Sequence, residues 1–198
     1  MYGVYMRIFY TASYYGKQAY QEQYDLVRAT IKEFNADLIS PEEGNYLDVI
    51  DPKTRKRLEG NPELIHYEAI RQGIHLADAV IIEATHEDIQ LGHEITLALM
   101  EKKPMLVLST KEDFSKKIIH EYLFGARYAK ETVKGILQDF FAKVREIRHA
   151  RRFNMFLYPA QAEYVEKASQ KQGMNMSEYI RHLINLDRRA SDPGETRS

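Results

Sequence analysis

The sequence predicts an α/β protein in which helices cover both faces of a parallel sheet. Short apolar segments alternate along the chain with segments whose apolar residues recur at helical spacing. The segment 79–82 (AVII) is apolar at every position, so a strand there would be buried on both of its faces. Buried strands that alternate with helices are typical of a parallel sheet between two helical layers.

Each element is predicted from its own pattern. The strands are expected at 4–12 (VYMRIFYTA), 36–40 (ADLIS), 78–84 (DAVIIEA) and 104–109 (PMLVLS). The first helix is expected at 19–34, where Tyr20, Tyr24, Val27, Ile31 and Phe34 recur at helical spacing. Further helices are expected at 62–76, 89–102 and 131–148, and another near Lys111. The polar segment 41–62 is predicted to be a loop, and loops of such length usually carry function or are mobile.

Composition narrows the possible functions. The 198 residues include 28 basic and 29 acidic ones, so the net charge of −1 gives no bulk attraction to nucleic acid or to anionic membranes. The absence of cysteine excludes disulfides and thiolate metal sites, and we expect neither a metal nor a cofactor. The N-terminal segment MYGVYMRIFY has no signal-peptide pattern, and no run reaches the roughly 18 apolar residues of a membrane span. We therefore expect a soluble cytoplasmic protein.

The segment 83–95 (EATHEDIQLGHEI) places several acidic residues between a predicted strand and a predicted helix. Ligands of parallel sheets bind at this position, beyond the carboxyl ends of the strands. Asp88 is expected to cap the helix, and Gly92 would let a ligand approach the backbone closely. Glu94 borders the apolar stripe of the helix, which makes it a half-buried carboxylate at the mouth of a crevice. The alternative is a capped helix start with solvated acids.

Zinc binding by His86 and His93 is a weaker interpretation of the same segment. The two histidines are seven positions apart, and no third ligand follows at a matching spacing.

Three stretches of the chain together resemble one enzyme family. They are RIFYTASYYGKQAYQEQY (7–24), LADAVIIEATHEDIQLGHEITLALMEKKPMLVLS (76–109) and YLFGARY (122–128). This pattern of strand, acidic loop, Gly-x-Glu and Lys-Pro before the next strand is similar to the nucleoside 2-deoxyribosyltransferase family. It is most like the family's branch of deoxynucleoside 5′-monophosphate N-glycosidases. The resemblance implies a Rossmann-like fold for residues 1–148.

The resemblance also implies roles for individual residues. Glu94 would be the catalytic nucleophile that attacks the anomeric carbon and expels the base, and the N-terminus of its helix would favour the ionised carboxylate. Ser13 and Gly16 would hold oxygens of the sugar or the phosphate. Glu83 and His120 would lie near the substrate, with His120 contributed by a neighbouring chain.

At four positions the chain differs from the family branch. Phe9, followed by Tyr10, stands where the branch has a tyrosine that orients the nucleophile, and Tyr15, with Lys17 nearby, stands where it has an arginine. Asp88 replaces a phosphate-binding serine, and a carboxylate there would repel a phosphate. In the helix before the third strand the family has an aspartate, for which Glu68 is a poorly aligned substitute. A nucleoside and a 5′-monophosphate are therefore both open as substrates. Tyr10, Tyr14 and Tyr15 are predicted to form flat walls for the base.

The C-terminal segment 149–189 is predicted to be a separate unit. RRFNMFLYP (151–159) alternates like a strand, and helices are expected at 160–172 and from Ser177, a candidate cap, to about 186, with Gly173 between them. This β-α-α order resembles the ribbon-helix-helix family, whose strands pair between two chains. The resemblance implies a homo-oligomer, either a dimer or a tetramer. Residues 190–198 are expected to be a disordered tail.

Two functions follow from these patterns. The first is cleavage or transfer of an N-glycosidic bond of a nucleoside or nucleotide through Glu94. The second is a regulator that senses a nucleoside-like ligand and binds DNA through Arg152 and Asn154, residue types that read guanine and adenine edges. From Arg145 to Arg189 there are nine basic and five acidic residues, a modest positive charge, so pure dimerisation is equally compatible with this segment.

Overall fold

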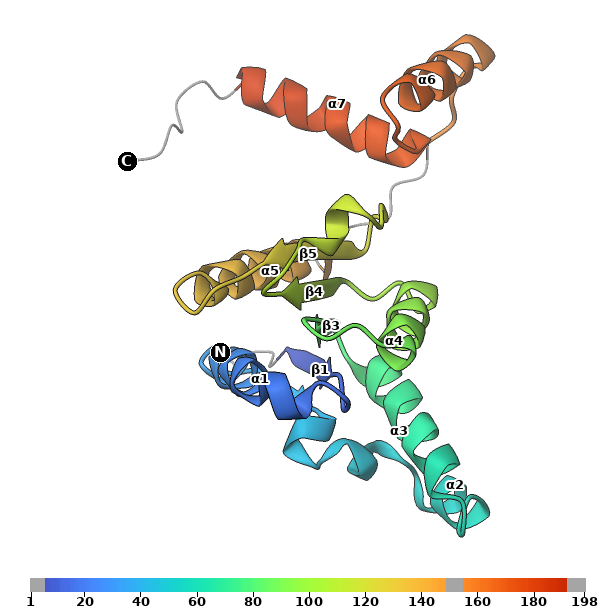
Figure 1. The fold of residues 1–198 in the computed structure, drawn as a ribbon. Coiled ribbons are helices and arrows are strands. Elements are labelled where there is room, and N and C mark those ends of the chain that lie inside the picture. The colour runs from blue at the N-terminus through green and yellow to red at the C-terminus, as the bar shows by residue number, and fades with distance from the viewer. Residues whose placement is uncertain (1–5, 149–154, 192–198) are drawn as a thin grey trace. The chain divides into compact units, whose positions relative to one another are not determined.

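A computed structural model describes residues 6–148 and 155–191, which belong to two compact units, Met1–Ala150 and Arg151–Ser198. The first unit contains a five-stranded parallel sheet of order β2-β1-β3-β4-β5 (Figure 1). Its strands are β1 (Arg7–Ala12), β2 (Asp37–Ile39), β3 (Ala79–Glu83), β4 (Met105–Ser109) and β5 (Leu123–Arg127). The predicted α/β class with a parallel sheet is confirmed.

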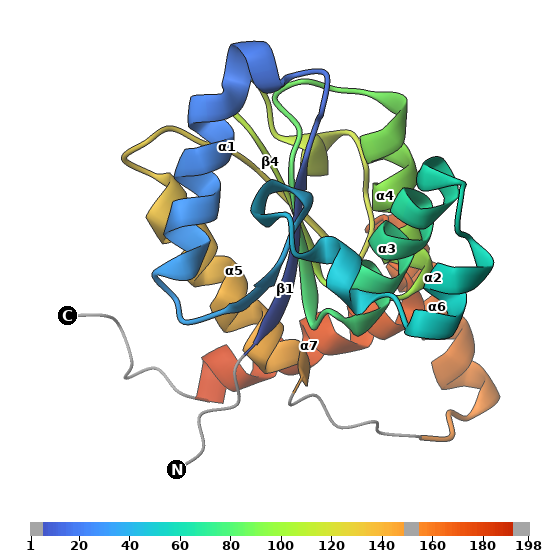
Figure 2. The ribbon, with the colours of Figure 1, turned by 90° about the horizontal axis from the view of Figure 1, so that it is seen from below.

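Helices cover both faces of this sheet (Figure 2). Helices α1 (Lys17–Lys32) and α5 (Val133–Arg148) lie on one face, and α3 (Pro62–Leu76) and α4 (Ile89–Met100) lie on the other. Two hydrophobic clusters fill the space between sheet and helices. Successive side chains of β1 alternate between them: Tyr10 lies in the cluster of α1 and α5, and Phe9 lies in the cluster of α3 and α4.

The order of the strands fixes where a ligand can bind. After β1 the chain moves outward to β2 and then returns to the other side of β1 to form β3. The loops that follow β1 and β3 therefore leave the sheet in different directions, and a crevice opens between them at the carboxyl ends of these strands. The loop after β1 begins at Ser13, and the loop after β3 leads into α4, which contains Glu94.

Strand β5 was not among the predicted strands. It is a half-buried strand at the edge of the sheet, and Gly125 interrupts its apolar pattern. A Cβ atom at Gly125 would lie 2.5 Å from the backbone nitrogen of Ser115, so the short helix η3 (Phe114–Lys116) packs directly against the strand. The helix expected near Lys111 is therefore only this single helical turn.

The predicted loop 41–62 contains three short helices, η1 (Pro41–Glu43), η2 (Tyr46–Val49) and α2 (Pro52–Arg57). Proline at the first position and a capping side chain explain two of them. Ser40 accepts from the backbone N–H of Glu42 at the start of η1, and Asp51 accepts from two N–H groups at the start of α2. The segment is thus ordered, and it brings Tyr46 against α3.

The second unit contains helices α6 (Pro159–Lys171) and α7 (Met176–Ser191), separated by Gly173 with a left-handed φ of 67°. Asn175, and not the predicted Ser177, caps α7, because its side chain accepts from the backbone N–H of Glu178. Residues 155–158 do not form a strand, and the rest of the predicted ribbon, including Arg152 and Asn154, lies outside the described residues. Helix α7 extends to Ser191, so the first two residues of the predicted disordered tail are helical, and the rest of it, 192–198, lies outside the described residues. Within the described ranges, no helix has the length and apolarity that crossing a membrane requires.

Candidate active site

Ser13 and Asp88 join the two loops that border the crevice. The Ser13 hydroxyl donates a hydrogen bond to Asp88 Oδ2, and Asp88 Oδ1 accepts from the backbone N–H of Leu91 at 2.8 Å. Asp88 is therefore the N-cap of α4, as predicted, and it also holds the loop after β1. Because the Ser13 hydroxyl donates its single proton to Asp88, it can meet a substrate only as an acceptor in this arrangement.

Gly16 is required by close packing at the start of α1. A Cβ atom at this position would lie 2.1 Å from the Tyr24 hydroxyl and 2.6 Å from Cβ of His86. The Gly16 N–H donates to the Ser13 hydroxyl at 3.2 Å. The glycine thus allows the loop after β1 to pack against the loop after β3.

Glu94 lies in the second turn of α4 and is only 1% exposed, so it is far more buried than the half-buried carboxylate that was expected. Its Oε1 accepts a hydrogen bond of 3.0 Å from Nε2 of Gln90, one helical turn earlier. Its Oε2 is buried and has no hydrogen-bond partner among the described residues. Buried polar side-chain atoms are nearly always bonded, and among the described residues only this oxygen and the hydroxyl of Tyr24 are buried without a partner.

Burial raises the pKa of Glu94 to about 7, and the nearby carboxylate of Asp88 adds to this rise. Polar contacts with Gln90 and Thr11 oppose the rise but do not cancel it. The expectation that the N-terminus of the helix would favour the ionised form is therefore not met. Glu94 lies beyond the first turn, where the effect of the helix dipole is largely lost.

A cavity of about 300 Å³ lies at the carboxyl ends of β1 and β2. Glu94 does not line it, but Gln90 and Thr11, which both contact Glu94, do. Ligand cavities of proteins begin at about this volume. The cavity is lined by residues from four parts of the chain: Thr11, Ala12, Tyr14, Tyr15, Lys17, Pro41, Glu42, Tyr46, His66 and Gln90. Tyr14 and Tyr15 are exposed aromatic side chains at its rim, at the positions predicted for walls around a base.

The single cation of the cavity lining is already paired. Lys17 Nζ lies 2.9 Å from Oε1 of Glu42, whose side chain is only 4% exposed. On the opposite wall, Tyr46 and His66 are hydrogen bonded to each other at 2.9 Å. Burial lowers the pKa of His66, which favours the neutral imidazole. The lining therefore carries little net charge.

Three of the residues predicted to bind substrate are covered by protein atoms. Phe9 is fully buried against Gly73 of α3, and Tyr10 is fully buried on the other face of the sheet, where its hydroxyl donates to the carbonyl of Tyr24. Glu83 is fully buried on the same face as Tyr10, where it accepts from the hydroxyls of Thr85 and Tyr128. Burial raises the pKa of Glu83. These residues support the loops and offer no surface to a ligand.

Gly92 and His120 also lie outside the cavity. Gly92 is exposed on α4, and a Cβ atom added there would meet no atom within 4 Å. His120 precedes β5 at the amino ends of the strands, the opposite edge of the sheet from Glu94, and accepts from the backbone N–H of Tyr122. Within one chain His120 cannot reach the substrate of the same site.

No metal site forms among the described residues, since nowhere do three potential ligands gather there. His93 stacks on Tyr67 with the ring centroids 5.7 Å apart, and His86 lies beside the ring of Tyr20. The two histidines considered for zinc thus have separate aromatic neighbours.

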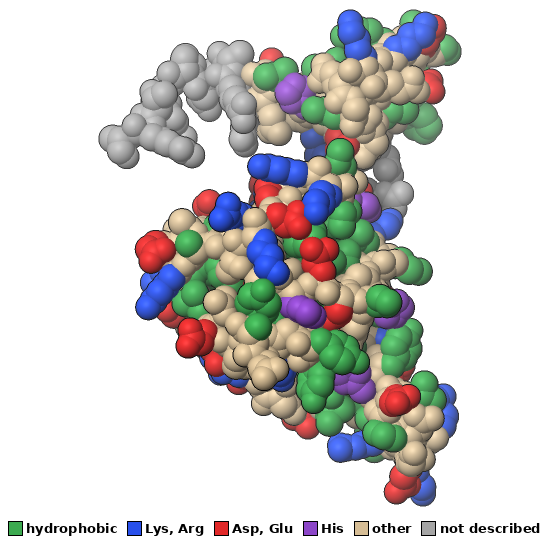
Figure 3. Space-filling model, viewed as in Figure 1, with side chains coloured by type: hydrophobic (Ala, Val, Ile, Leu, Met, Phe, Trp, Pro, Cys, Tyr) green, Lys and Arg blue, Asp and Glu red, His purple; other side chains and the backbone are tan. Residues whose placement is uncertain are grey.

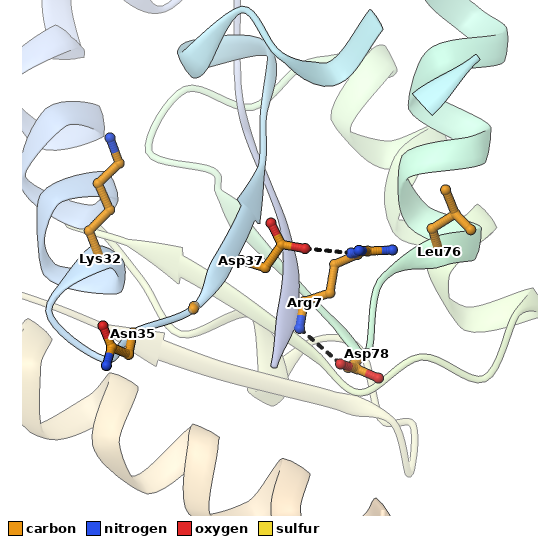
Figure 4. Close-up of a pocket in the computed structure, with 7 residues that line it drawn as sticks. Arg7, Lys32, Asn35, Asp37, Leu76 and Asp78 are labelled. Atoms are coloured by element: carbon orange, nitrogen blue, oxygen red, sulfur yellow. Dashed lines mark hydrogen bonds and ion pairs between the residues drawn. The ribbon is translucent and has the colours of Figure 1, made fainter. Parts of the chain in front are cut away.

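A larger hollow lies at the amino ends of the strands (Figure 4). Arg7 bonds there to Asp37 at 2.7 Å, and its backbone N–H donates to Asp78. Asp78 forms its ion pair with Arg148, and Lys32 forms one with Glu43, so each charged side chain of the hollow has a partner. On the face of the sheet unit seen in Figure 3, basic and acidic side chains are likewise interspersed, with no extended region of one sign.

Residues that the sequence analysis did not name complete the site: Thr11, Glu42, Tyr46, His66 and Gln90. Gln90 could have been found from the sequence, because it precedes Glu94 by four positions on a predicted helix. The others come from distant segments and carry no such signal. Comparison with protein-family models gives no match to this chain, and none of the curated proteins matches it.

Proposed function

We propose that the protein cleaves or transfers the N-glycosidic bond of a nucleoside, with Glu94 as the nucleophile. The observation that carries this proposal is the buried Oε2 of Glu94, which has no hydrogen-bond partner among the described residues. Gln90, which bonds to the other oxygen of Glu94, lines a small cavity with exposed tyrosines at its rim. A carboxylate with one oriented oxygen and one free oxygen suits attack on a sugar carbon. The resemblance of the Gly-x-Glu segment to nucleoside 2-deoxyribosyltransferases points to the same residue.

Besides the nucleoside, the proposed chemistry needs only the protein and an acceptor, which is water for cleavage and a second base for transfer. Oε2 of ionised Glu94 forms a bond to the anomeric carbon, and the bond between this carbon and the base nitrogen breaks. The electron pair leaves with the base, which takes up a proton. Water, or the nitrogen of a second base, then attacks the same carbon and releases Glu94. Because the pKa of Glu94 is about 7, the reactive form increases as the pH rises through neutrality.

The charges around the cavity favour a nucleoside over a 5′-monophosphate. Lys17 is neutralised by Glu42, and Asp88 adds a carboxylate close to Glu94. A phosphate group would have to break the ion pair or lie near these carboxylates, and both cost free energy. Tyr14 and Tyr15 provide aromatic surface for a base.

A direct assay tests the proposal. The full-length protein is incubated with a panel of nucleosides and the matching 5′-monophosphates, first in water and then with a second free base present. Release of free base supports cleavage, and formation of a new nucleoside supports transfer. If neither product forms from any member of the panel, the proposed function is wrong.

Asp88→Ser is expected to increase the efficiency with a 5′-monophosphate relative to the matching nucleoside. The substitution removes a negative charge from the crevice, while serine can still cap α4. Removal of one like charge at short range should change the ratio of the two kcat/KM values by about tenfold. A ratio that stays constant or falls would mean that Asp88 does not face the 5′ end of the substrate.

We further propose that the C-terminal unit pairs two chains. Large apolar side chains of its two helices are exposed, among them Tyr164, Ile184 and Leu186, and a unit of this size rarely folds on a core of its own. Binding of DNA through Arg152 and Asn154 stays a prediction of the sequence.

Removal of residues 151–198 is therefore expected to lower the number of subunits in the assembly. The sheet unit should remain folded, because both of its hydrophobic clusters lie within residues 6–148. Light scattering gives the subunit count, and circular dichroism checks the fold. Equal counts for the full-length and the shortened chain would contradict the pairing.

A further inference from the structure

A chain of hydrogen bonds, called the line below, connects the side chain of Glu94 through Gln90 and His66 to Tyr46 in the cavity wall. Gln90 Nε2 lies 3.0 Å from Oε1 of Glu94 and 3.1 Å from Nε2 of His66. The other ring nitrogen of His66, Nδ1, lies 2.9 Å from the hydroxyl of Tyr46. The four residues come from α4, α3 and η2, so tertiary structure alone brings them together.

The donors and acceptors of this line have one consistent arrangement when Glu94 is ionised. The amide nitrogen of Gln90 carries two protons, one for the carboxylate and one for Nε2 of His66. Nε2 must then be an acceptor, so the proton of the neutral imidazole is on Nδ1 and points to the Tyr46 oxygen. If the amide of Gln90 were turned over, its oxygen would face the carboxylate, which is repulsive.

Packing holds His66 in this arrangement. Its ring meets the ring of Tyr46 edge to face, with the centroids 5.4 Å apart, and the side chain is partly buried between η2 and α4. A neutral imidazole is needed for Nε2 to accept, and burial, which lowers the pKa of His66, favours that form. His66 and Tyr46 thereby restrict the Gln90 amide to the position that meets Glu94.

We propose that Gln90, held by His66 and Tyr46, is a positioning residue that binds one carboxylate oxygen of Glu94 and leaves the other free for attack. This inference rests on the proposed function in so far as it concerns catalysis. Gln90 bonds to Oε1, and Oε2 has no hydrogen-bond partner among the described residues, so Oε2 is available to form the bond to the sugar. The amide also stabilises the charge of the carboxylate, because it donates to the ionised form.

The other charged and titratable groups near this line are few. Asp88 on α4 acts on Glu94 directly, and Lys17 and Glu42 line the same cavity from α1 and η1 as an ion pair. None of the three is changed by a substitution at Gln90, His66 or Tyr46. A change in the pH dependence of activity in such variants therefore results from the loss of these hydrogen bonds.

The test compares Gln90→Ala, His66→Ala and Tyr46→Phe with the full-length wild-type protein. His75→Ala is the matched control, since His75 lies on the same helix as His66 and bonds to Glu101 away from the cavity. Gln90 lies on the surface of α4, and alanine is a strong helix former, so the Gln90 variant should fold.

We expect Gln90→Ala to lower kcat by about ten- to a hundredfold, because the nucleophile loses its orientation. The acid limb of the pH profile should move upward by about one pH unit, since loss of one donor destabilises the ionised carboxylate. His66→Ala should have a smaller effect in the same direction, and Tyr46→Phe the smallest. His66→Gln keeps an acceptor near the position of Nε2 and should recover most of the activity lost in His66→Ala.

Carbon-13 NMR of labelled glutamate separates this inference from the proposed function. It measures the pKa of Glu94 in wild type and in Gln90→Ala without any substrate. If the wild-type protein cleaves no nucleoside or nucleotide, the proposed function is wrong, but a higher pKa of Glu94 in Gln90→Ala still supports the contact. An unchanged pKa of Glu94 together with an unchanged kcat in Gln90→Ala would overturn the positioning role, as would an equal effect of His75→Ala.

Discussion

Glu94→Ala is expected to abolish release of the base, with a loss in kcat on the order of a thousandfold or more. The alanine variant cannot form the bond to the anomeric carbon, and the other carboxylates near the cavity are engaged elsewhere: Asp88 is bonded to Ser13 and to the backbone of Leu91. Glu83 is fully buried on the other face of the sheet, and Glu42 is paired with Lys17. The measurement is the rate of base release under single-turnover conditions, which reports the chemical step alone.

A matched control separates loss of the nucleophile from loss of an acidic side chain in general. Glu87→Ala removes an exposed carboxylate from the loop just before α4 and should leave the rate within about twofold of wild type. Mass spectrometry of the wild-type protein with a slow substrate should detect a sugar bound to the peptide that contains Glu94. Equal rates for Glu94→Ala and wild type would refute the assignment of the nucleophile.

Glu94→Gln is expected to stabilise the protein at alkaline pH while it removes the activity. The pKa of Glu94 is about 7 in the folded protein against an ordinary value of 4.5, so the folded state binds the proton more tightly than the unfolded state does. The stabilisation from this proton is fully present below pH 4.5 and is lost as the pH rises through 7. At pH 8 the loss amounts to about 3 kcal/mol, since each unit of pKa difference corresponds to about 1.4 kcal/mol.

Denaturant unfolding at pH 5, 6.5 and 8 tests this expectation. The difference in the free energy of unfolding between Glu94→Gln and wild type should shift in favour of the variant as the pH rises, and taking the difference cancels the other titrating groups. Glu87→Gln is the control for a change of charge in the same part of the fold. A difference that is constant over this range would mean that Glu94 is ionised in the folded protein as easily as in the unfolded chain.

The sequence indicated where the candidate site lies along the chain, but not how deeply Glu94 is buried. The alternation of strands and helices predicts that the segment 83–95 lies at the carboxyl ends of parallel strands, and Asp88 caps α4 as expected. The same pattern describes Glu94 only as a residue beside an apolar stripe. Its burial to 1% exposure depends on residues from segments far away in the chain, such as Thr11 of β1, which contacts Glu94.

Strand β5 and the segment 41–62 also depend on contacts between distant segments, which the sequence does not reveal. Gly125 breaks the apolar pattern of β5, and the strand forms because β4 offers an unpaired edge for its backbone hydrogen bonds. In 41–62 the proline and capping residues that start short helices are visible in the sequence, yet nothing local indicates that Tyr46 will meet His66.

What the sequence by itself determined are the properties that depend on near neighbours in the chain. These are the α/β class, four of the five strands, the long helices, the cap at Asp88, and Glu94 as the residue of interest. Only the tertiary structure decided that Phe9, Tyr10 and Glu83 are covered, that Lys17 is neutralised by Glu42, and that Gln90, His66 and Tyr46 form one line with Glu94. The physical reason is the separation along the sequence over which each effect acts. Periodicity and capping involve residues a few positions apart, whereas burial, ion pairing and pKa depend on contacts between distant segments.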